Sequence, residues 1–287
     1  MPKKIYVGII GVLVGLTLVI MSITAKNQSG KFAEAALDGN AAEVARFLAK
    51  GMDVNAKAAQ GLTALMAASN KGRTEIVKRL IKAGADVNIA SDSGGTALMD
   101  ASWNGHVGVV KLLLASGADA NAKDKLGTTA LAGAAGQGQT EAAKSLIERG
   151  ADTNVRANDG KTPLIVACIN GLTEMVRLLL ENGASPNASD KEGFTPLMYA
   201  TVKGRVEVAK LLLEKGANVN AVENSGGTAL MLASYEGQLE IAKLLLQKGA
   251  DTNIKEKTGK TALSMASAKG HERVVALLKG KSQPQPK

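Results

Sequence analysis

Apolar residues along the chain form short runs with a periodic spacing. In one run Ile76, Val77, Leu80 and Ile81 are apolar, and polar or charged residues flank them. Side chains spaced in this way fall on a single stripe of a helix. Gly84 follows the run, and glycine suits the left-handed residue at which a helix ends. The pattern therefore predicts an amphipathic helix that stops near Gly84.

A shorter apolar run precedes this helix, and an "AD-x-N" segment rich in turn-forming residues follows it. The shorter run holds adjacent alanines, such as residues 67–68, which allow close helix approach. We expect each unit to be helix, turn, helix and hairpin loop. One position within the second helix holds Arg79, Leu112 and Ser145, and we expect that position to face outward.

The unit recurs with an unbroken period of 33 residues, which seven threonines mark: Thr63, Thr96, Thr129, Thr162, Thr195, Thr228 and Thr261. A glycine stands two residues before each threonine and a leucine two residues after it. A fixed period of this length is typical of a stacked solenoid, in which each unit buries the apolar face of its neighbour.

The segment "GKTPLIVACINGLTEMVRLLLENGASPNASD" and the recurring G-x-T-[AP]-L core resemble the ankyrin repeat. The resemblance covers about residues 31–280 and implies an all-α solenoid, an ankyrin repeat stack. One departure is systematic, because the family's histidine after the leucine is replaced by Met66, Met99, Met198 and Met231. The resemblance also implies that partners dock on the concave side, which hairpin tips and first helices form.

We divide the chain into a signal anchor or signal peptide (1–25), a short linker (26–31), an ankyrin repeat domain of about eight repeats (32–280) and a disordered tail (281–287). In the first unit Phe32 stands where later units have leucine, and Glu43 replaces Ile76. In the last unit Lys279 replaces Ile81. Polar replacements suit terminal repeats, which we expect to act as caps because their outer faces meet water.

Residues 5–23 carry no charge, and a helix of this length nearly spans the hydrocarbon core of about 30 Å. A cleaved signal peptide is the alternative, but the best cleavage site ends at Ala25 with Ile23 two residues earlier. We favour an uncleaved transmembrane helix that leaves the repeats in the periplasm of a bacterium or outside the cell. Gly11 and Gly15 form a GxxxG pair that could give a weak homodimer.

Charge argues against a nucleic-acid partner. The net charge is +9, but seven lysines lie at the two ends of the chain, where there is no acid: Lys3, Lys4, Lys26, Lys31, Lys279, Lys281 and Lys287. The remaining basic and acidic residues nearly balance, so the repeats lack the concentrated basic stripe that phosphate backbones require.

The sequence shows no pattern for catalysis, and we expect neither an enzyme nor a cofactor. The triplet Gly259-Lys260-Thr261 resembles the end of a phosphate-binding loop, but Ile254 stands where the loop needs glycine. His106 and His271 share one repeat position, five repeats apart, which excludes a shared metal. Cys168 occupies a small-residue position of a first helix, where we expect it to be packed rather than reactive.

What remains is a binding surface. The two residues before each turn glycine vary between repeats, as does the residue between glycine and threonine. Rare aromatic residues occur there, and exposed aromatics are typical interface anchors. The predicted partner-binding residues are Trp103, Asn104, Gln137, Asn170, Phe194, Lys203, Tyr235 and Glu236. The alternative is that the aromatics fill gaps between repeats.

We therefore expect a membrane-tethered protein-interaction scaffold on the non-cytoplasmic side, with an unknown protein partner on the concave face. The first alternative is a secreted ankyrin repeat effector, released by signal cleavage. The second is an enzyme with an unrecognised site, for which the sequence offers no candidate residues.

Overall fold

The computed structural model describes residues 27–281. This part of the chain is helical, and its only β-type pairings are two isolated bridges, Ala90 with Thr96 and Val222 with Thr228. It divides into two compact units, with the boundary between Lys125 and Leu126. None of the helices described is long and apolar enough to span a membrane. The predicted anchor at residues 5–23 and its GxxxG pair lie outside the described residues.

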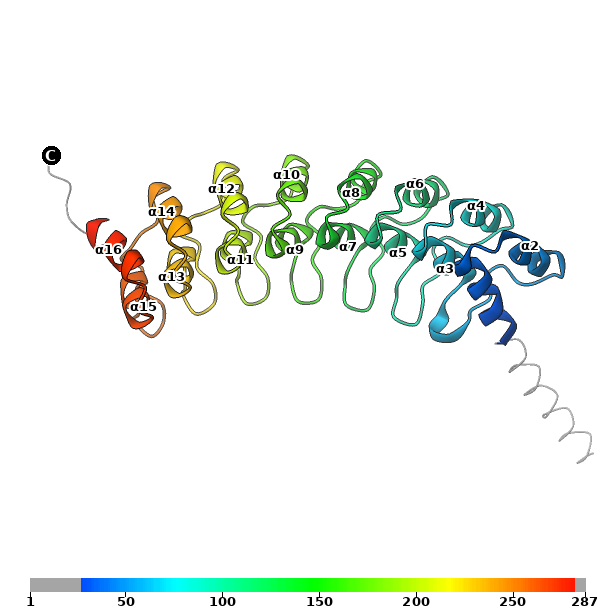
Figure 1. Cartoon of the computed structure of the whole chain (residues 1–287), viewed down its shortest axis with the longest axis horizontal. Helices are drawn as coiled ribbons and strands as arrows, with labels where there is room; N and C mark the ends of the chain where they lie inside the picture. The colour runs from blue at the N-terminus through cyan, green and yellow to red at the C-terminus, as the bar shows by residue number, and fades with distance from the viewer. Residues whose placement is uncertain (1–26, 282–287) are drawn as a thin grey trace, which may run out of the picture. The chain divides into compact units, whose positions relative to one another are not determined.

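Unit 1 contains the helical residues 27–38 and the short helices that follow them in pairs (Figure 1). Its named elements are α2 (Ala41–Ala49), the 3-10 turn η1 (Ala59–Gly61), α3 (Ala64–Asn70), α4 (Thr74–Lys82), α5 (Ala97–Trp103) and α6 (Val107–Ala115). The first helices α3 and α5 pack side by side, and so do the second helices α4 and α6.

Unit 2 repeats this arrangement, and in Figure 1 its hairpin loops project beside the first helices. The elements are α7 (Ala130–Gln137), α8 (Thr140–Ile147), α9 (Pro163–Asn170), α10 (Thr173–Glu181), α11 (Pro196–Val202), α12 (Val206–Glu214), α13 (Ala229–Tyr235), α14 (Leu239–Gln247), α15 (Ala262–Ala268) and α16 (Glu272–Lys281). Helix α16 thus includes one residue of the predicted tail, and residues 282–287 lie outside the described part.

The predicted apolar stripe of the second helices forms the core. Ile76, Val77 and Leu80 are buried, and Ile81 is half-buried at the end of α4. The prediction that the intervening position faces outward is wrong for Ser145, which is buried because α8 packs against the next second helix, α10. Its hydroxyl donates to the Glu141 carbonyl oxygen at 3.0 Å, so the burial leaves no unpaired group.

The "AD-x-N" segments join neighbouring hairpins through asparagine side chains. The Asn88 amide nitrogen donates to the Gly117 carbonyl oxygen at 3.0 Å, and its oxygen accepts from the Asp119 N–H at 2.8 Å. The same pair of bonds recurs at three asparagines of unit 2: Asn154, Asn187 and Asn220. Each asparagine therefore satisfies one backbone donor and one acceptor of the following hairpin.

Candidate functional site

Threonine caps fix where each first helix begins. In the seven repeats that carry it, the threonine hydroxyl oxygen accepts a hydrogen bond from the N–H three residues later, at 3.2–3.3 Å. This contact satisfies one of the free donors at a helix N-terminus. The cap also explains the triplet Gly259-Lys260-Thr261, because the Thr261 hydroxyl accepts a hydrogen bond from the Ser264 N–H and so caps a helix. The triplet is thus part of the repeat.

Because every first helix begins at the same point, the fourth residue after each threonine takes the same place in its unit. We call this set the groove column. Its members are Ala67 and Asp100 in unit 1, and Gly133, Val166, Tyr199, Leu232 and Met265 in unit 2. We include Glu34, which stands at the same repeat position in the first repeat, where Gly30 replaces the threonine. The sequence analysis missed this column. The sequence did contain a signal for it: the residue type at this position changes from repeat to repeat, whereas the residues on either side of it stay small or aliphatic.

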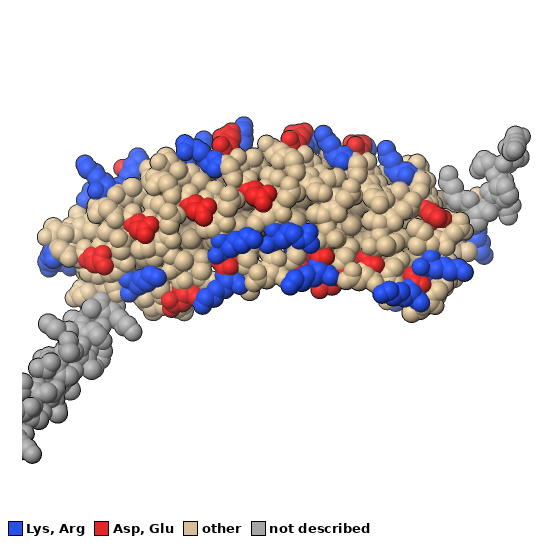
Figure 2. All heavy atoms as spheres, turned by 180° about the vertical axis from the view of Figure 1, so that it is seen from behind, with Lys and Arg blue, Asp and Glu red and all other residues tan. Residues whose placement is uncertain are grey.

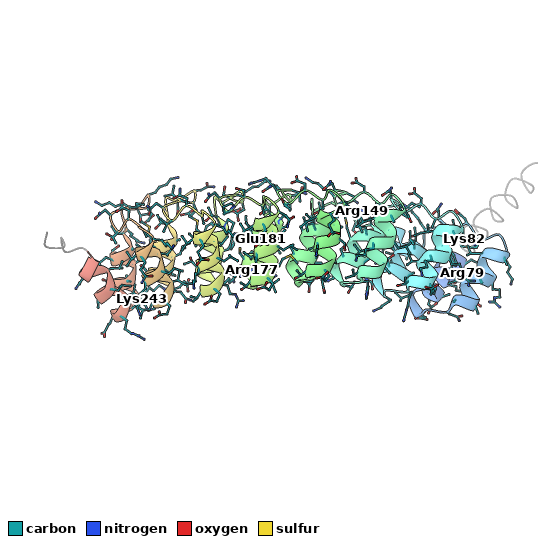
Figure 3. The ribbon with its side chains drawn as sticks, turned by 90° about the horizontal axis from the view of Figure 1, so that it is seen from above. Arg79, Lys82, Arg149, Arg177, Glu181 and Lys243 are labelled. Atoms are coloured by element: carbon teal, nitrogen blue, oxygen red, sulfur yellow. The ribbon has the colours of Figure 1, made fainter. Side chains whose placement is uncertain are left out.

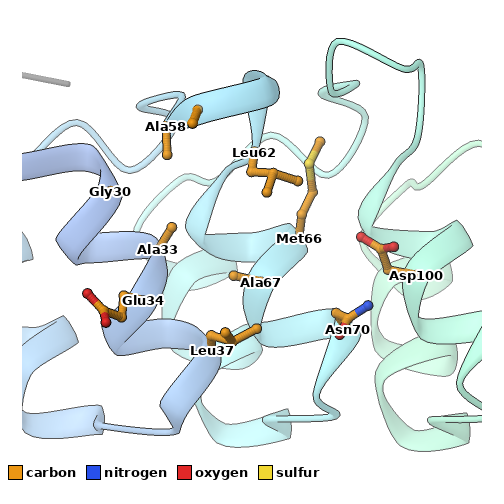
Figure 4. Close-up of a pocket in the computed structure, with 11 residues that line it drawn as sticks. Gly30, Ala33, Glu34, Leu37, Ala58, Leu62, Met66, Ala67, Asn70 and Asp100 are labelled. Atoms are coloured by element: carbon orange, nitrogen blue, oxygen red, sulfur yellow. The ribbon is translucent and has the colours of Figure 1, made fainter. Parts of the chain in front are cut away.

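The groove column lines a cavity of about 450 Å³ in unit 1. The walls come from residues 27–38, the hairpin loop around η1, and helices α3 and α5. In Figure 4 Glu34 and Asp100 lie on opposite sides of the cavity, and Met66 and Ala67 lie between them. Leu62, which is exposed, and Leu37 complete the apolar wall. The cavity is therefore an apolar hollow flanked by two carboxyl groups.

Asp100 is the titratable group of this cavity with a displaced pKa. Burial against the apolar wall raises the pKa of its carboxyl to about 6, while a hydrogen bond with the Asn70 side chain acts in the opposite direction. Desolvation disfavours the charged form of an acid, so the first cause dominates. Near neutral pH the carboxyl is thus ionised at an energetic cost, which a cation beside it would reduce.

A second cavity, of about 340 Å³, lies in unit 2. It contains Leu232 and Met265 of the groove column and the predicted anchor Tyr235, whose side chain is 46% exposed. The Lys269 ammonium lies 4.2 Å from the centre of the Tyr235 ring, a cation–π contact. Glu223 and Glu256 are also in the lining, so this cavity combines an apolar floor with charges of both signs.

Phe194 is half-buried, unlike Tyr235. Its ring centre lies 5.4 Å from that of Tyr199, a groove-column residue. The Tyr199 hydroxyl donates to Asp190 at 2.5 Å, and Asp190, which is 4% exposed, also accepts from the Phe194 N–H at 2.9 Å. Burial and the neighbouring Asp190 raise the pKa of the Tyr199 hydroxyl. Phe194 therefore belongs to a packed cluster that supports the surface.

The other predicted site residues are exposed within their own units. Trp103 is 52% exposed in unit 1. Asn104 donates to the Asp100 carbonyl oxygen and Asn170 to the Gly136 carbonyl oxygen, each at 2.9 Å. The structure also exposes Gln137, Lys203 and Glu236. Their contact with a partner stays a prediction.

The two histidines and the cysteine are part of the repeat packing. Nε2 of His106 lies 2.9 Å from the Asn70 carbonyl oxygen, and Nε2 of His271 lies at the same distance from that of Tyr235. Cys168 is buried, and burial raises the pKa of its thiol. Within residues 27–281 no group of three or more potential metal ligands forms a site.

The second helices carry charged side chains on their outer side, among them Arg79, Arg177 and Lys243 in Figure 3. Lys78 pairs with Glu75 at 2.7 Å, and Lys243 pairs with Glu240 at 2.9 Å. Arg177 pairs more loosely with Glu174, at 3.6 Å. On the face seen in Figure 2, acidic and basic side chains are likewise interspersed. Such pairs contribute little stability, and they mark a solvated surface.

Comparison with known proteins identifies the family. A family profile described as "Ankyrin repeats (3 copies)" matches residues 32–124, 131–223 and 220–286. The chain belongs to the ankyrin repeat family, whose repeats form protein-interaction modules. A search of curated protein sequences finds no match.

Among solved structures, the chain is similar to the ankyrin repeat domain of Bcl-3, described as a unique member of the IkappaB protein family. The sequences are 34% identical, the match covers 77% of this chain and 100% of that one, and the TM-score is 0.70. These matches do not indicate an enzyme. They also give no support to the expected bacterial source.

Proposed function

We propose that this protein is a membrane-tethered scaffold whose ankyrin repeats bind a partner protein on the non-cytoplasmic side. The observation that carries the binding role is the position of Tyr235. A large aromatic side chain is exposed at the edge of an apolar cavity, in a protein of an interaction family. Exposed aromatics beside such hollows are frequent anchors of protein interfaces.

The tether rests on the sequence. Residues 5–23 are uncharged and as a helix would nearly span the hydrocarbon core of a bilayer, and lysines precede them. An uncleaved anchor would hold the repeats at the non-cytoplasmic surface. The secreted alternative differs only in cleavage after Ala25.

Site-specific photocrosslinking tests the binding surface. A photoreactive phenylalanine analogue replaces Tyr235 in the full-length protein, and a matched variant carries it at Lys243 on the outer side of α14. We expect a covalent partner, identified by mass spectrometry, from position 235 and not from position 243. Equal labelling at both positions would show that the cavity side is not the interface.

A captured partner then allows a quantitative measurement. We expect Tyr235→Ala to weaken its binding by about 2 kcal/mol, the scale of an anchor residue, with little change in the melting temperature. Unchanged affinity would show that Tyr235 is not part of the interface.

Fractionation tests the tether. Full-length protein should remain with membranes after an alkaline carbonate wash, and protease added to the non-cytoplasmic side should digest the repeats. Soluble protein that begins at Lys26 would establish the secreted alternative instead.

A further inference from the structure

The cavity of unit 1 differs in its lining from the cavity around Tyr235. Its lining residues are apolar apart from Glu34, Asn70 and Asp100, and they include no lysine or arginine. Two acids on opposite sides of an apolar hollow complement a ligand that is aliphatic at its centre and positively charged beside it (Figure 4).

We infer that this cavity binds a segment of a partner protein that inserts an aliphatic side chain against Ala67 and Leu62 and sets an arginine or lysine beside Asp100. The inference rests on the proposed function, since it requires that the repeats bind protein. It adds the chemistry of the segment and a second contact site.

The shape of the cavity supports the aliphatic part. Ala67 is smaller than Val166 and Leu232, which stand at the same repeat position in unit 2, and so leaves more room in the cavity. The volume of about 450 Å³ exceeds what one aliphatic side chain needs, so part of the peptide backbone also fits.

The electrostatics support the basic part. Asp100 is largely desolvated, and its side-chain partner is the neutral amide of Asn70. Two basic residues next in sequence or space to the lining donate to backbone oxygens, Lys57 to Ala90 at 2.9 Å and Arg73 to Leu37 at 3.1 Å. A guanidinium or ammonium group from a partner would therefore supply a counter-charge to Asp100.

This arrangement predicts a direction of pH dependence. A bound cation lowers the pKa of Asp100 below its value of about 6 in the free protein. Affinity should then be constant well above that pH and fall below it, by up to about tenfold per pH unit. The other titratable groups facing this region are Glu34 across the cavity and His106, whose ring contacts the Asn70 carbonyl oxygen.

The experiment selects displayed random peptides that lack tryptophan on the full-length protein in detergent micelles. We expect the enriched sequences to pair leucine, isoleucine or methionine with a nearby arginine or lysine. A synthetic consensus peptide is the probe. Trp103, the chain's only tryptophan, follows Asp100 by three residues on α5, so its fluorescence reports binding.

Two variants test whether the consensus peptide binds in the unit 1 cavity. Ala67→Leu fills the cavity with the residue that unit 2 holds at Leu232, and Asp100→Asn removes the charge at constant shape. Each should weaken binding by about tenfold or more, while Glu75→Gln on α4 should leave it unchanged. The loss of affinity at low pH should disappear in Asp100→Asn, whereas a contribution from Glu34 or His106 would persist.

Three results would overturn the inference: no enriched peptide, a consensus without a basic residue, or a probe that binds Ala67→Leu and Asp100→Asn as tightly as the unchanged protein. Photocrosslinking of a native partner from position 235 is independent of all three. A partner captured there with a failed peptide selection therefore removes this inference and leaves the proposed function intact. Absence of that partner removes the proposed function itself.

Discussion

A single position of the repeat can hold an alanine, a carboxyl group or a tyrosine without altering the backbone around it. Ala67, Asp100 and Tyr199 all occupy the groove column, four residues after a capping threonine. The cap and the buried leucines keep the helix in place, so the side chain at this position is free to set the surface chemistry. At Asp100 that freedom has a cost in stability.

The cost of Asp100 should depend on pH. Its pKa is about 6 in the folded protein and near 3.8 when unfolded, so folding favours the protonated acid. Stability should therefore fall as pH rises through this interval and stay lower above it. We expect Asp100→Asn to stabilise the protein by about 2 kcal/mol at pH 7.5, allowing for partial exposure, and by little at pH 4. Urea unfolding at both values measures this, and an equal effect at both would contradict the desolvation account.

Substitutions of Phe194 and Tyr235 should differ in their effect on the free energy of unfolding. Phe194→Ala removes the ring that packs against Tyr199, so we expect a loss of about 2 kcal/mol in the free energy of unfolding, less than for a fully buried ring. Tyr235→Ala loses only an exposed ring and its contact with Lys269, so it should cost about 0.5 kcal/mol. Thermal unfolding of both variants gives the comparison, and equal losses would show that Tyr235 is also a packing residue.

At the scale of the helix, the outer charge pairs show a gap in α6. Glu75, Glu141, Glu174, Glu207 and Glu240 share one repeat position, and each has a basic residue three positions later. Gly108 interrupts the series, which leaves Lys111 without an acid at that spacing. A Cβ atom added at Gly108 would meet Thr74 Oγ1 at 3.8 Å, an ordinary contact.

Gly108→Glu should therefore stabilise unit 1 by about 1 kcal/mol. The change removes a flexible glycine, places a negative charge in the first turn of α6 and adds a pair with Lys111. The matched control Gly108→Lys also removes the glycine but places two like charges together, so it should stabilise less. Melting temperatures distinguish them, and equal gains would mean that charge plays no part.

At the scale of a whole unit, stability is close to a sum over repeats and their interfaces. The repeat containing α7 and α8 buries smaller apolar side chains than the repeat containing α11 and α12, because Gly133 and Gly136 lie in α7 and Ala142 in α8 stands where α12 has Val208. The two missing methyl groups of Ala142 alone remove about 1.5 kcal/mol of burial.

This repeat should open locally before its neighbours. We expect faster amide hydrogen exchange at residues 130–147 than at residues 197–213, measured by mass spectrometry of peptic fragments in native buffer. Both segments belong to unit 2, so each is a control for the other. Equal protection would mean that packing from α9 and α10 restores the lost stability.

The sequence by itself determined the period, the family, the order of helices and the buried stripe at Ile76, Val77 and Leu80. These features repeat, and a repeated pattern reports its own structural role because every copy meets a similar environment. The exposure of Tyr235 was predictable for the same reason, since it stands at a position that varies between repeats.

The tertiary structure alone decided which varying positions meet a cavity. Ser145 is buried because the neighbouring helix α10 lies against α8. Phe194 packs on Tyr199 because the hairpin loop that holds Phe194 and Asp190 lies against α11. The periodicity of a single helix reports neither contact. Asp100 likewise reads as an ordinary surface acid in the sequence. Its displaced pKa arises from burial, and α3, which is distant in sequence, lies beside α5 only because the repeats stack.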